Sequence, residues 1–150
     1  MVCLGNICRS PLAEGVLQHK ADALGLNWQV DSAGTNQYHI GEPPHRSSQK
    51  VAKENGIDIS KQRARKFIPE DFDHYDKIYV MATDVWRDVK YLAGNKFDKN
   101  KIDYFLNELY PGENQDVFDP WYGTEKDFVS VFDQINQTAD AIIKKYNRNL

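Results

Sequence analysis

The sequence has 150 residues, of which 41% are hydrophobic and 27% charged, and its formal net charge is −3. This length suits one domain with a full core, so residues 1–150 are expected to form a single domain, while the negative charge argues against a nucleic-acid or acidic-membrane partner held by bulk charge. No apolar run approaches the ~18 residues of a membrane span, no signal peptide is visible, and two cysteines do not make a disulfide framework, so a reducing cytoplasm is the expected location.

The first predicted helix runs from Pro11 to about Leu24. Ser10 suits the N-cap, proline suits the first helical position, and Gly25 suits the C-terminal stop. Apolar residues recur at three- and four-residue steps and predict one stripe facing the core. These residues are Ala13, Val16, Leu17, Ala21 and Leu24.

A short strand is predicted at residues 29–33, ending in Gly34, and residues 36–45 form a loop rich in glycine and proline. A second helix is expected at about residues 47–55. The run Lys61-Gln62-Arg63-Ala64-Arg65-Lys66 is interpreted as a solvated face, because runs of like charge usually lie in solvent.

The second half alternates strands and helices. Strands are predicted at residues 77–81 and 102–106, with a helix at about residues 83–92, begun by Thr83-Asp84, between them. A long irregular segment, residues 107–123, leads to a final helix that begins with a capping box of Thr124 and Asp127. Its apolar residues share one face. They are Phe128, Val131, Phe132, Ile135, Ala139, Ile142 and Tyr146.

This alternation predicts an α/β fold with three layers, in which a central four-stranded parallel sheet has helices on both faces in a doubly wound arrangement. Such a sheet needs a strand that leads into Cys3, yet only Met1 and Val2 precede it. We expect either that residues are missing upstream, which we favour, or that this strand is unusually short.

The stretch Cys3-Leu4-Gly5-Asn6-Ile7-Cys8-Arg9-Ser10-Pro11 is typical of a phosphate-binding loop with a nucleophile at its base. Backbone N–H groups in such a turn converge on an anion, and the following helix N-terminus adds partial positive charge. Arg9 can hold two oxygens of a phosphoryl group, and the same positive field favours the thiolate of Cys3. These residues predict phosphoryl transfer through a cysteinyl phosphate.

A leaving alkoxide or phenoxide also needs a proton donor. Asp119, in Asp119-Pro120-Trp121-Tyr122-Gly123, is the candidate because it lies in the long irregular segment, where catalytic groups are often carried. Pro120 restricts Asp119 to an extended conformation. Taken alone, the same residues are also typical of an Asp-Pro turn with packed aromatic side chains.

Together the two stretches resemble the signatures of the low-molecular-weight protein tyrosine phosphatases. The resemblance implies that Cys3 is the nucleophile, that Arg9 binds the phosphoryl group, and that Asp119 is the general acid and then the general base. It needs no metal or other cofactor. The implied substrate is a phosphotyrosine protein, with a tyrosine kinase as one candidate, and the protein is expected to be a monomer or weak dimer.

The resemblance also assigns supporting roles. It places Leu4, Gly5, Asn6, Ile7, Cys8 and Ser10 in the phosphate-binding loop, and Ser32 in its support. It places Tyr38, His39, Trp121 and Tyr122 around the mouth of the site, where aromatic rings would flank a phosphotyrosine ring. His19, His45 and His74 are interpreted as surface residues, and the four histidines have no metal-ligand spacing.

Two positions depart from the family pattern. Gln62 replaces a histidine that supports the loop in some members, and Ala82 replaces an acidic residue. Neither change removes a catalytic group. Cys8 is either a redox partner that forms a reversible disulfide with Cys3 or a small apolar side chain packed under the loop.

Three alternatives stay open. An arsenate reductase would need further cysteines, and the chain has none beyond Cys8. A phosphoarginine phosphatase resembles the same loop but has a smaller polar residue at the position of Ile7 and lacks the paired aromatic residues. A non-catalytic phosphate-binding module is expected to lose Cys3 or Asp119.

Overall fold

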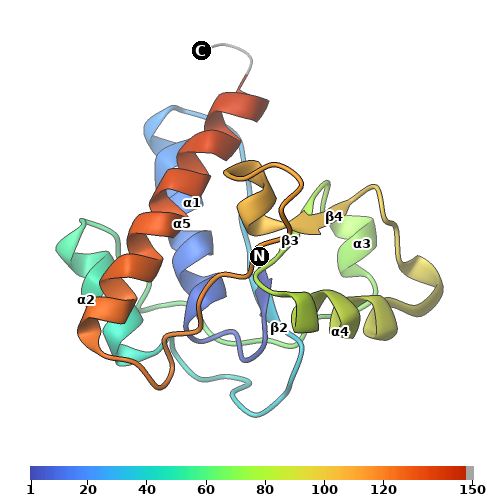
Figure 1. Cartoon of the computed structure of the whole chain (residues 1–150), viewed down its shortest axis with the longest axis horizontal. Helices are drawn as coiled ribbons and strands as arrows, with labels where there is room; N and C mark the ends of the chain where they lie inside the picture. The colour runs from blue at the N-terminus through green and yellow to red at the C-terminus, as the bar shows by residue number, and fades with distance from the viewer. Residues whose placement is uncertain (148–150) are drawn as a thin grey trace.

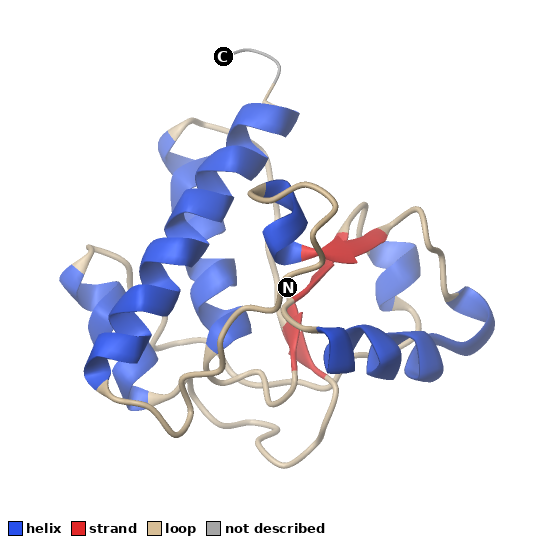
Figure 2. Cartoon of the chain, in the orientation of Figure 1, coloured by secondary structure: helices blue, strands red, loops and turns tan. Residues whose placement is uncertain are grey.

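The computed structural model describes residues 1–147, and the predicted α/β class is confirmed by a parallel sheet that lies between helices (Figures 1 and 2). In chain order the elements are β1 (Val2–Cys3), α1 (Arg9–Ala23), β2 (Ala33–Gly34), α2 (Arg46–Glu54), α3 (Asp71–His74), β3 (Ile78–Val80), α4 (Thr83–Ala93), η1 (Gly94–Lys96), β4 (Ile102–Tyr104), η2 (Phe105–Glu108) and α5 (Glu125–Tyr146).

The sheet order is β2-β1-β3-β4, and all three pairings are parallel. In this register Cys3 lies opposite Gly34, and Val2 lies between Ala33 and Val80. The nucleophile candidate therefore sits at the carboxyl end of a central strand. Ligands of open α/β sheets bind at that edge.

Alternate residues of β3 enter two different cores, as the two-residue period of a strand requires. Tyr79 and Met81 pack on one face of the sheet, under α1, α2 and α5. Ile78 and Val80 pack on the other face, under α4. In Figure 1, α1 and α5 cross side by side, and α3 and α4 lie on the opposite side of the sheet.

The predicted helices form, but several of their details differ from the prediction. The first helix begins at Arg9, so Ser10 is inside its first turn and is not the N-cap, because its hydroxyl serves the loop described below. The last helix has the predicted capping box, and its stripe is buried except for Tyr146, whose ring is 43% exposed. Leu24, expected in the core, is also exposed and lies just beyond α1.

The strands are shorter than predicted. Residues 29–32 lie outside β2, which covers only Ala33 and Gly34. β4 ends at Tyr104, and the chain then tightens into η2, so Phe105 and Leu106 are buried in a 3₁₀ turn. α3 was not predicted, because a four-residue helix leaves no periodic pattern.

The basic run at residues 61–66 is not uniformly solvated. Lys61 and Arg63 are exposed, but Ala64 is buried and Arg65 is half-buried. The Arg65 guanidinium pairs with Asp71 at 3.0 Å and with Asp31 at 3.2 Å. Ala64 and Arg65 therefore have a structural role. The charge pattern alone could not predict it, because the acidic partners of Arg65 lie elsewhere in the sequence.

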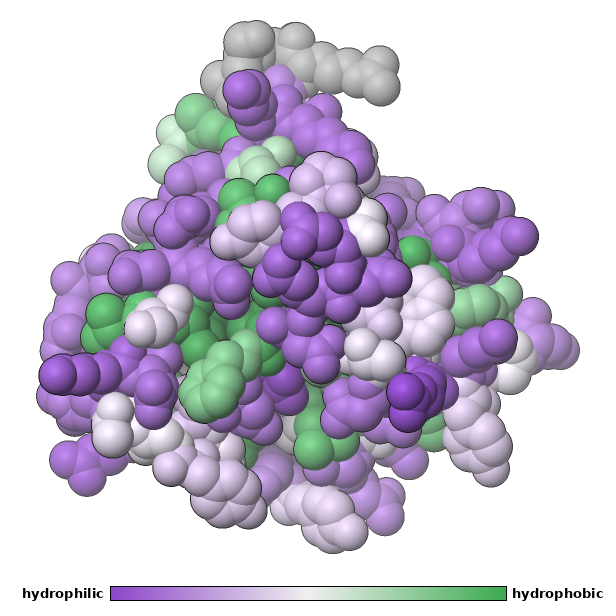
Figure 3. Space-filling model, viewed as in Figure 1, coloured by the Kyte–Doolittle hydropathy of each residue, from purple (hydrophilic) through white to green (hydrophobic). Residues whose placement is uncertain are grey.

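The face of the molecule in Figure 3 is mainly hydrophilic, with small apolar areas separated by polar side chains. Within residues 1–147, no helix combines the length and the apolar character required to cross a bilayer. The longest helix, α5, has 22 residues and carries charged side chains along its exposed side.

Candidate active site

The phosphate-binding loop joins the end of β1 to the start of α1. Its turn depends on Asn6, which has a left-handed backbone conformation with φ of 57°. It also depends on Gly34 of the neighbouring strand. A Cβ at Gly34 would lie 2.9 Å from the Leu4 carbonyl oxygen and 3.0 Å from the Gly5 carbonyl carbon. Only glycine lets the loop approach β2 this closely.

The side chain of Asn6 determines the direction of the hydrogen bonds around Cys3. Its Oδ1 accepts from the Arg65 N–H at 3.0 Å, so its Nδ2 is the donor to the hydroxyls of Ser10 at 2.8 Å and Ser32 at 2.9 Å. Both amide hydrogens are then used. Each serine oxygen accepts one amide hydrogen of Asn6, so each serine hydroxyl is free to donate its own hydrogen to another acceptor.

The Ser10 hydroxyl lies 2.9 Å from Cys3 Sγ, so it donates to the sulfur. The Asn6 backbone N–H adds a second donor at 3.3 Å. Cys3 is only 3% exposed, and a buried thiolate requires such donors. The sulfur of Cys3 is therefore a hydrogen-bond acceptor for two donors at the base of the loop.

The Ser32 hydroxyl donates to Glu14 Oε1 at 2.7 Å. Burial raises the pKa of Glu14, and the hydrogen bond from Ser32 opposes that shift. As an acceptor, Glu14 holds Ser32 in the orientation that receives the Asn6 amide. Glu14 was missed by the sequence analysis, although it lies four residues after Ser10 and so on the same face of α1.

Arg65 was also missed. Its backbone N–H holds Asn6, and its carbonyl oxygen accepts from the Gly34 N–H at 2.8 Å. The segment that was predicted to be solvent-facing thus fixes both the loop and the glycine on which the loop rests.

Arg9 is buried at the base of α1, with 5% of its surface exposed. Its Nη1 donates to the Val117 carbonyl oxygen at 3.0 Å, and its Nη2 lies 3.6 Å from Asp119 Oδ2. A guanidinium has five N–H donors in a planar fork, so donors remain for two oxygens of a phosphoryl group.

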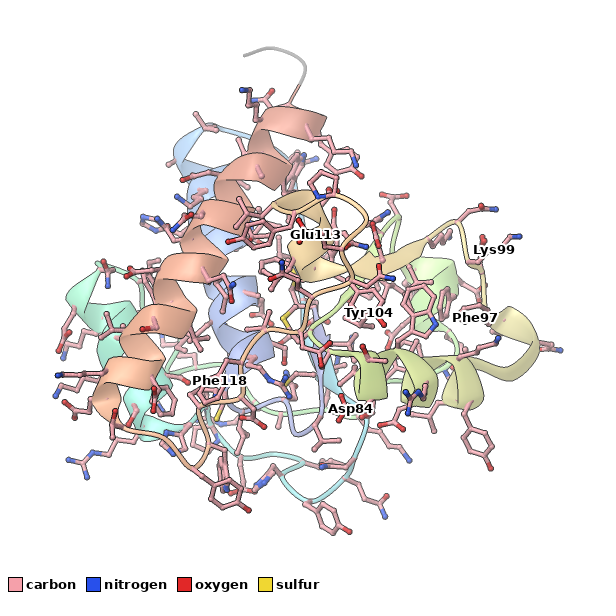
Figure 4. The ribbon with its side chains drawn as sticks, in the orientation of Figure 1. Asp84, Phe97, Lys99, Tyr104, Glu113 and Phe118 are labelled. Carbon is pink, nitrogen blue, oxygen red and sulfur yellow. The ribbon has the colours of Figure 1, made fainter. Side chains whose placement is uncertain are left out.

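The segment from Glu113 to Phe118, both labelled in Figure 4, carries Asp119 to the loop. Its path is fixed at two points: Asp116 accepts from the Thr83 N–H at 2.9 Å, and the Val117 N–H donates to the Met81 carbonyl oxygen at 2.7 Å. The first contact also corrects a prediction, because Asp116, and not Thr83 or Asp84, caps the start of α4.

Asp119 follows these anchors, and its side chain is 47% exposed. Its Oδ1 accepts from the Trp121 N–H at 3.1 Å, a short Asp turn that sets the direction of the carboxylate. The other oxygen faces Arg9. A carboxyl that is half-exposed to solvent and adjacent to a guanidinium can exchange protons with a group bound beside that guanidinium.

The predicted aromatic rim is assembled only in part. The Trp121 ring lies 5.4 Å from the His39 ring and 6.4 Å from that of Tyr122. Tyr38 and Tyr122 are 83% and 96% exposed, so neither side chain is packed into a rim. Ile7 is buried and lines a surface pocket of about 380 Å³ with Trp121, and Leu4 lies exposed at the loop surface.

His45 is less exposed than predicted, although it lines a surface pocket. It is half-buried between Trp121 and Phe128, at ring distances of 5.3 Å and 5.0 Å. His19 and His74 are exposed as predicted. The aromatic partners of His45 come from a distant part of the sequence, so its position could not be read from local pattern.

Cys8 is buried, and both cysteines are free thiols. Burial, with the nearby Cys3, raises the pKa of Cys8 to about 12. Cys8 is therefore a thiol at neutral pH and does not compete with Cys3 as a nucleophile.

The two departures from the family pattern have structural consequences. Gln62 Nε2 donates to the Pro11 carbonyl oxygen at 3.1 Å, and its Oε1 is buried with no partner among residues 1–147. Ala82 is buried in the core beside α4.

Comparison with known proteins identifies the family. A family model described as low molecular weight phosphotyrosine protein phosphatase matches residues 1–150. A low molecular weight phosphotyrosine protein phosphatase from Gallus gallus is 37% identical over 147 residues, which cover 96% of this chain and 92% of that protein. The chain belongs to this family. As a low molecular weight phosphotyrosine protein phosphatase, it is a hydrolase of phosphoric monoesters that acts on phosphoproteins.

Solved structures of similar proteins agree with this fold. A protein tyrosine phosphatase from Entamoeba histolytica, with Hepes in its active site, has a TM-score of 0.89 and 32% identity, covering 99% of this chain and 95% of its own. Wzb from Vibrio vulnificus, in complex with benzylphosphonate, has a TM-score of 0.85 and 31% identity, covering 96% and 94%. The doubly wound phosphatase fold predicted from the sequence is confirmed.

Proposed function

We propose that this phosphatase hydrolyses phosphotyrosine through a cysteinyl phosphate on Cys3. The observation that carries the proposal is the convergence of three groups from separate elements. Cys3 lies at the end of β1 with two hydrogen-bond donors on its sulfur, Arg9 lies at the base of α1, and Asp119 reaches Arg9 from the long segment before α5.

In the first step the Cys3 thiolate attacks phosphorus, and the bond from phosphorus to the phenolic oxygen breaks. Arg9 binds two non-bridging oxygens and stabilises the charge that develops on them. Protonated Asp119 gives its proton to the leaving phenolate. In the second step Asp119, now a carboxylate, accepts a proton from a water molecule that attacks phosphorus, and the thiolate leaves as inorganic phosphate forms.

The preference for an aryl substrate is supported by the residues at the mouth. The rings of Trp121 and His39 lie 5.4 Å apart, and His39 packs beside Gly5 of the loop. The Vibrio vulnificus relative binds benzylphosphonate, which carries a phenyl ring near a phosphonate group. The same chemistry suits the ring of a phosphotyrosine, and a tyrosine kinase that carries this modification is one candidate partner.

We further propose that residues 1–150 act as a single domain, as a monomer or weak dimer, in the cytoplasm. A reducing compartment keeps Cys3 and Cys8 as free thiols, and the reaction requires Cys3 in that form. The chemistry assigned to Cys3, Arg9 and Asp119 draws on the side chains of one chain, so it needs no second subunit.

The test is hydrolysis of an aryl phosphate in the presence of EDTA, at mildly acidic pH. The wild type should be active, Cys3→Ser should lose activity, and acid-quenched wild type should carry phosphate on Cys3 when examined by mass spectrometry. Full activity in the serine variant would refute the mechanism. Peptides containing phosphotyrosine, phosphoarginine or phosphoserine then decide the substrate class, and preference for phosphoarginine would replace the present assignment.

A further inference from the structure

We propose that His45 is a positioning residue that sets the place of the general acid by joining the phosphate-binding loop to the segment that carries Asp119. The inference rests on the proposed role of Asp119 in catalysis. It follows from contacts that a single residue makes with four parts of the molecule.

The first two contacts hold the backbone and ring of His45. Its N–H donates to the Ile7 carbonyl oxygen at 2.7 Å, which ties it to the phosphate-binding loop. Its Nδ1 accepts from the Ser47 N–H at 3.0 Å, which makes His45 the N-cap of α2. Histidine is not among the preferred N-cap residues, which are serine, threonine, aspartate and asparagine.

The other two contacts are made by the faces and edges of the ring. The ring stacks on Phe128 with an interplanar angle of 22°, and it meets the Trp121 ring nearly edge-on at 72°. Serine or asparagine would cap α2 equally well but could not make these contacts. The choice of an aromatic cap therefore points to a need for the ring itself.

Trp121 transmits the position of His45 to the acid. Its backbone N–H donates to Asp119 Oδ1, so the placement of Trp121 determines where the carboxylate points. Asp119 Oδ2 in turn faces Arg9. Contacts therefore connect the loop to His45, His45 to Trp121, Trp121 to Asp119, and Asp119 to Arg9 at the end of the loop. A small displacement of a reacting group can cost much of its catalytic effect.

The state of the ring agrees with this role. Burial lowers the pKa of His45, a shift in favour of the neutral ring, and Nδ1 accepts from the Ser47 N–H. The nearest charged residues on the same surface pocket are Glu42 and Arg46. Glu42 is engaged by His39 at 2.7 Å, so it does not pair with His45.

The experiment separates the cap from the ring. His45→Asn retains a cap acceptor and removes the ring, whereas His45→Phe retains the ring and removes the cap. Both are compared with wild type, with Asp119→Asn, and with His19→Asn as a control at an exposed histidine. The kcat/KM is measured for phenyl phosphate, whose leaving group needs a proton, and for a nitrophenyl phosphate, whose leaving group needs it less.

For His45→Asn we expect a loss of roughly fivefold with phenyl phosphate and less than about twofold with the nitrophenyl ester. His45→Phe should have the wild-type ratio of kcat/KM values for the two substrates. Its melting temperature should be a few degrees lower than that of His45→Asn, because it lacks the cap acceptor. Asp119→Asn should change the ratio in the same direction and by more. A purely structural role predicts equal losses for both substrates.

Three results would overturn the inference. In the first, His45→Asn has the wild-type ratio of kcat/KM values for the two substrates, whereas Asp119→Asn changes that ratio. This result would contradict the role of His45 and leave the proposed function intact. Another is an equal loss with both substrates in His45→Asn and His45→Phe. The third is no change of the ratio in Asp119→Asn, which removes the acid assignment and this inference with it. If a His45 variant fails to fold, Trp121→Leu breaks the same contact from the other side and should change the ratio as His45→Asn does.

Discussion

Asp119 and Arg9 face one another across the site, with Asp119 Oδ2 3.6 Å from Arg9 Nη2. The carboxylate thus neutralises part of the charge that would bind a phosphoryl group. The proposed proton donor and the proposed phosphate-binding cation are therefore neighbours before any substrate arrives.

Replacing Asp119 should separate catalysis from binding. Asp119→Asn is expected to lower kcat for phenyl phosphate by about 10²–10⁴-fold, because the leaving phenolate loses its proton donor. Competitive inhibition by inorganic phosphate should be unchanged or stronger, since the amide no longer opposes an anion at Arg9. Asp116→Asn is the control on the same segment, because its amide oxygen can still cap Thr83. Weaker phosphate binding in Asp119→Asn would contradict this interpretation.

Asn6 has a side-chain role and a backbone role, which two substitutions distinguish. Asn6→Ala and Asn6→Gly both remove the amide that orients Ser10, so both should reduce kcat/KM by at least about tenfold. Only glycine accepts the left-handed backbone easily, so Asn6→Gly should be more stable to urea than Asn6→Ala by about 1 kcal/mol. Asn114→Gly is matched in conformation, with φ of 52°, and should retain full activity.

The two cysteines should differ in reactivity toward an alkylating agent. Because the pKa of Cys8 is raised to about 12, iodoacetamide at pH 7 should modify only Cys3 in the folded protein. Phosphate should protect Cys3 from the reagent. Mass spectrometry of proteolytic fragments locates the modification, and rapid labelling of Cys8 in the native protein would show that its thiol is neither buried nor neutral.

We retain the proposal that Cys8 protects Cys3 from irreversible oxidation. Peroxide would convert the Cys3 thiolate to a sulfenic acid, and the Cys8 thiol would displace water from it to form a disulfide. Because Cys8 is protonated at neutral pH, this closure should accelerate as the pH rises. Peroxide-treated wild type should regain activity with a thiol reductant while Cys8→Ser should not, and equal recovery of the two would disprove the role.

Glu14 should make the stability depend on pH in a defined direction. Burial raises the pKa of its carboxyl above that of the unfolded chain, so its contribution to stability is present at low pH and is lost as the pH rises through the folded value. Glu14→Gln can still accept from Ser32 and does not titrate. The stability of Glu14→Gln relative to wild type should therefore increase from pH 4 to pH 7 in urea titrations. Glu54→Gln, at an exposed site, should show no such trend.

The α/β class and the longer helices could be predicted from sequence, and so could the two stretches that carry Cys3, Arg9 and Asp119, because local patterns encode them. The loop around Cys3 and the Asp119-Pro120 turn are short contiguous signals. The residues that hold the site in place, such as Arg65 and His45, could not be predicted from local patterns. Arg65 contacts Asn6 across 59 residues, and the aromatic partners of His45 lie more than 70 residues beyond it. Their roles arise only when the chain folds.

The structural role of Ala64 and Arg65 limits which residues of this enzyme can be exchanged by protein engineering. Exchanging surface lysine and arginine residues is a common way to alter solubility or to aid crystallisation, and the run from Lys61 to Lys66 is an obvious target for it. Lys61 is exposed and suits such an exchange, whereas Arg63, although exposed, donates to the carbonyl oxygens of Ser60 and Gln62. An exchange at Arg65 would instead loosen its ion pairs with Asp31 and Asp71, and with them the backbone N–H that holds Asn6 beside Cys3.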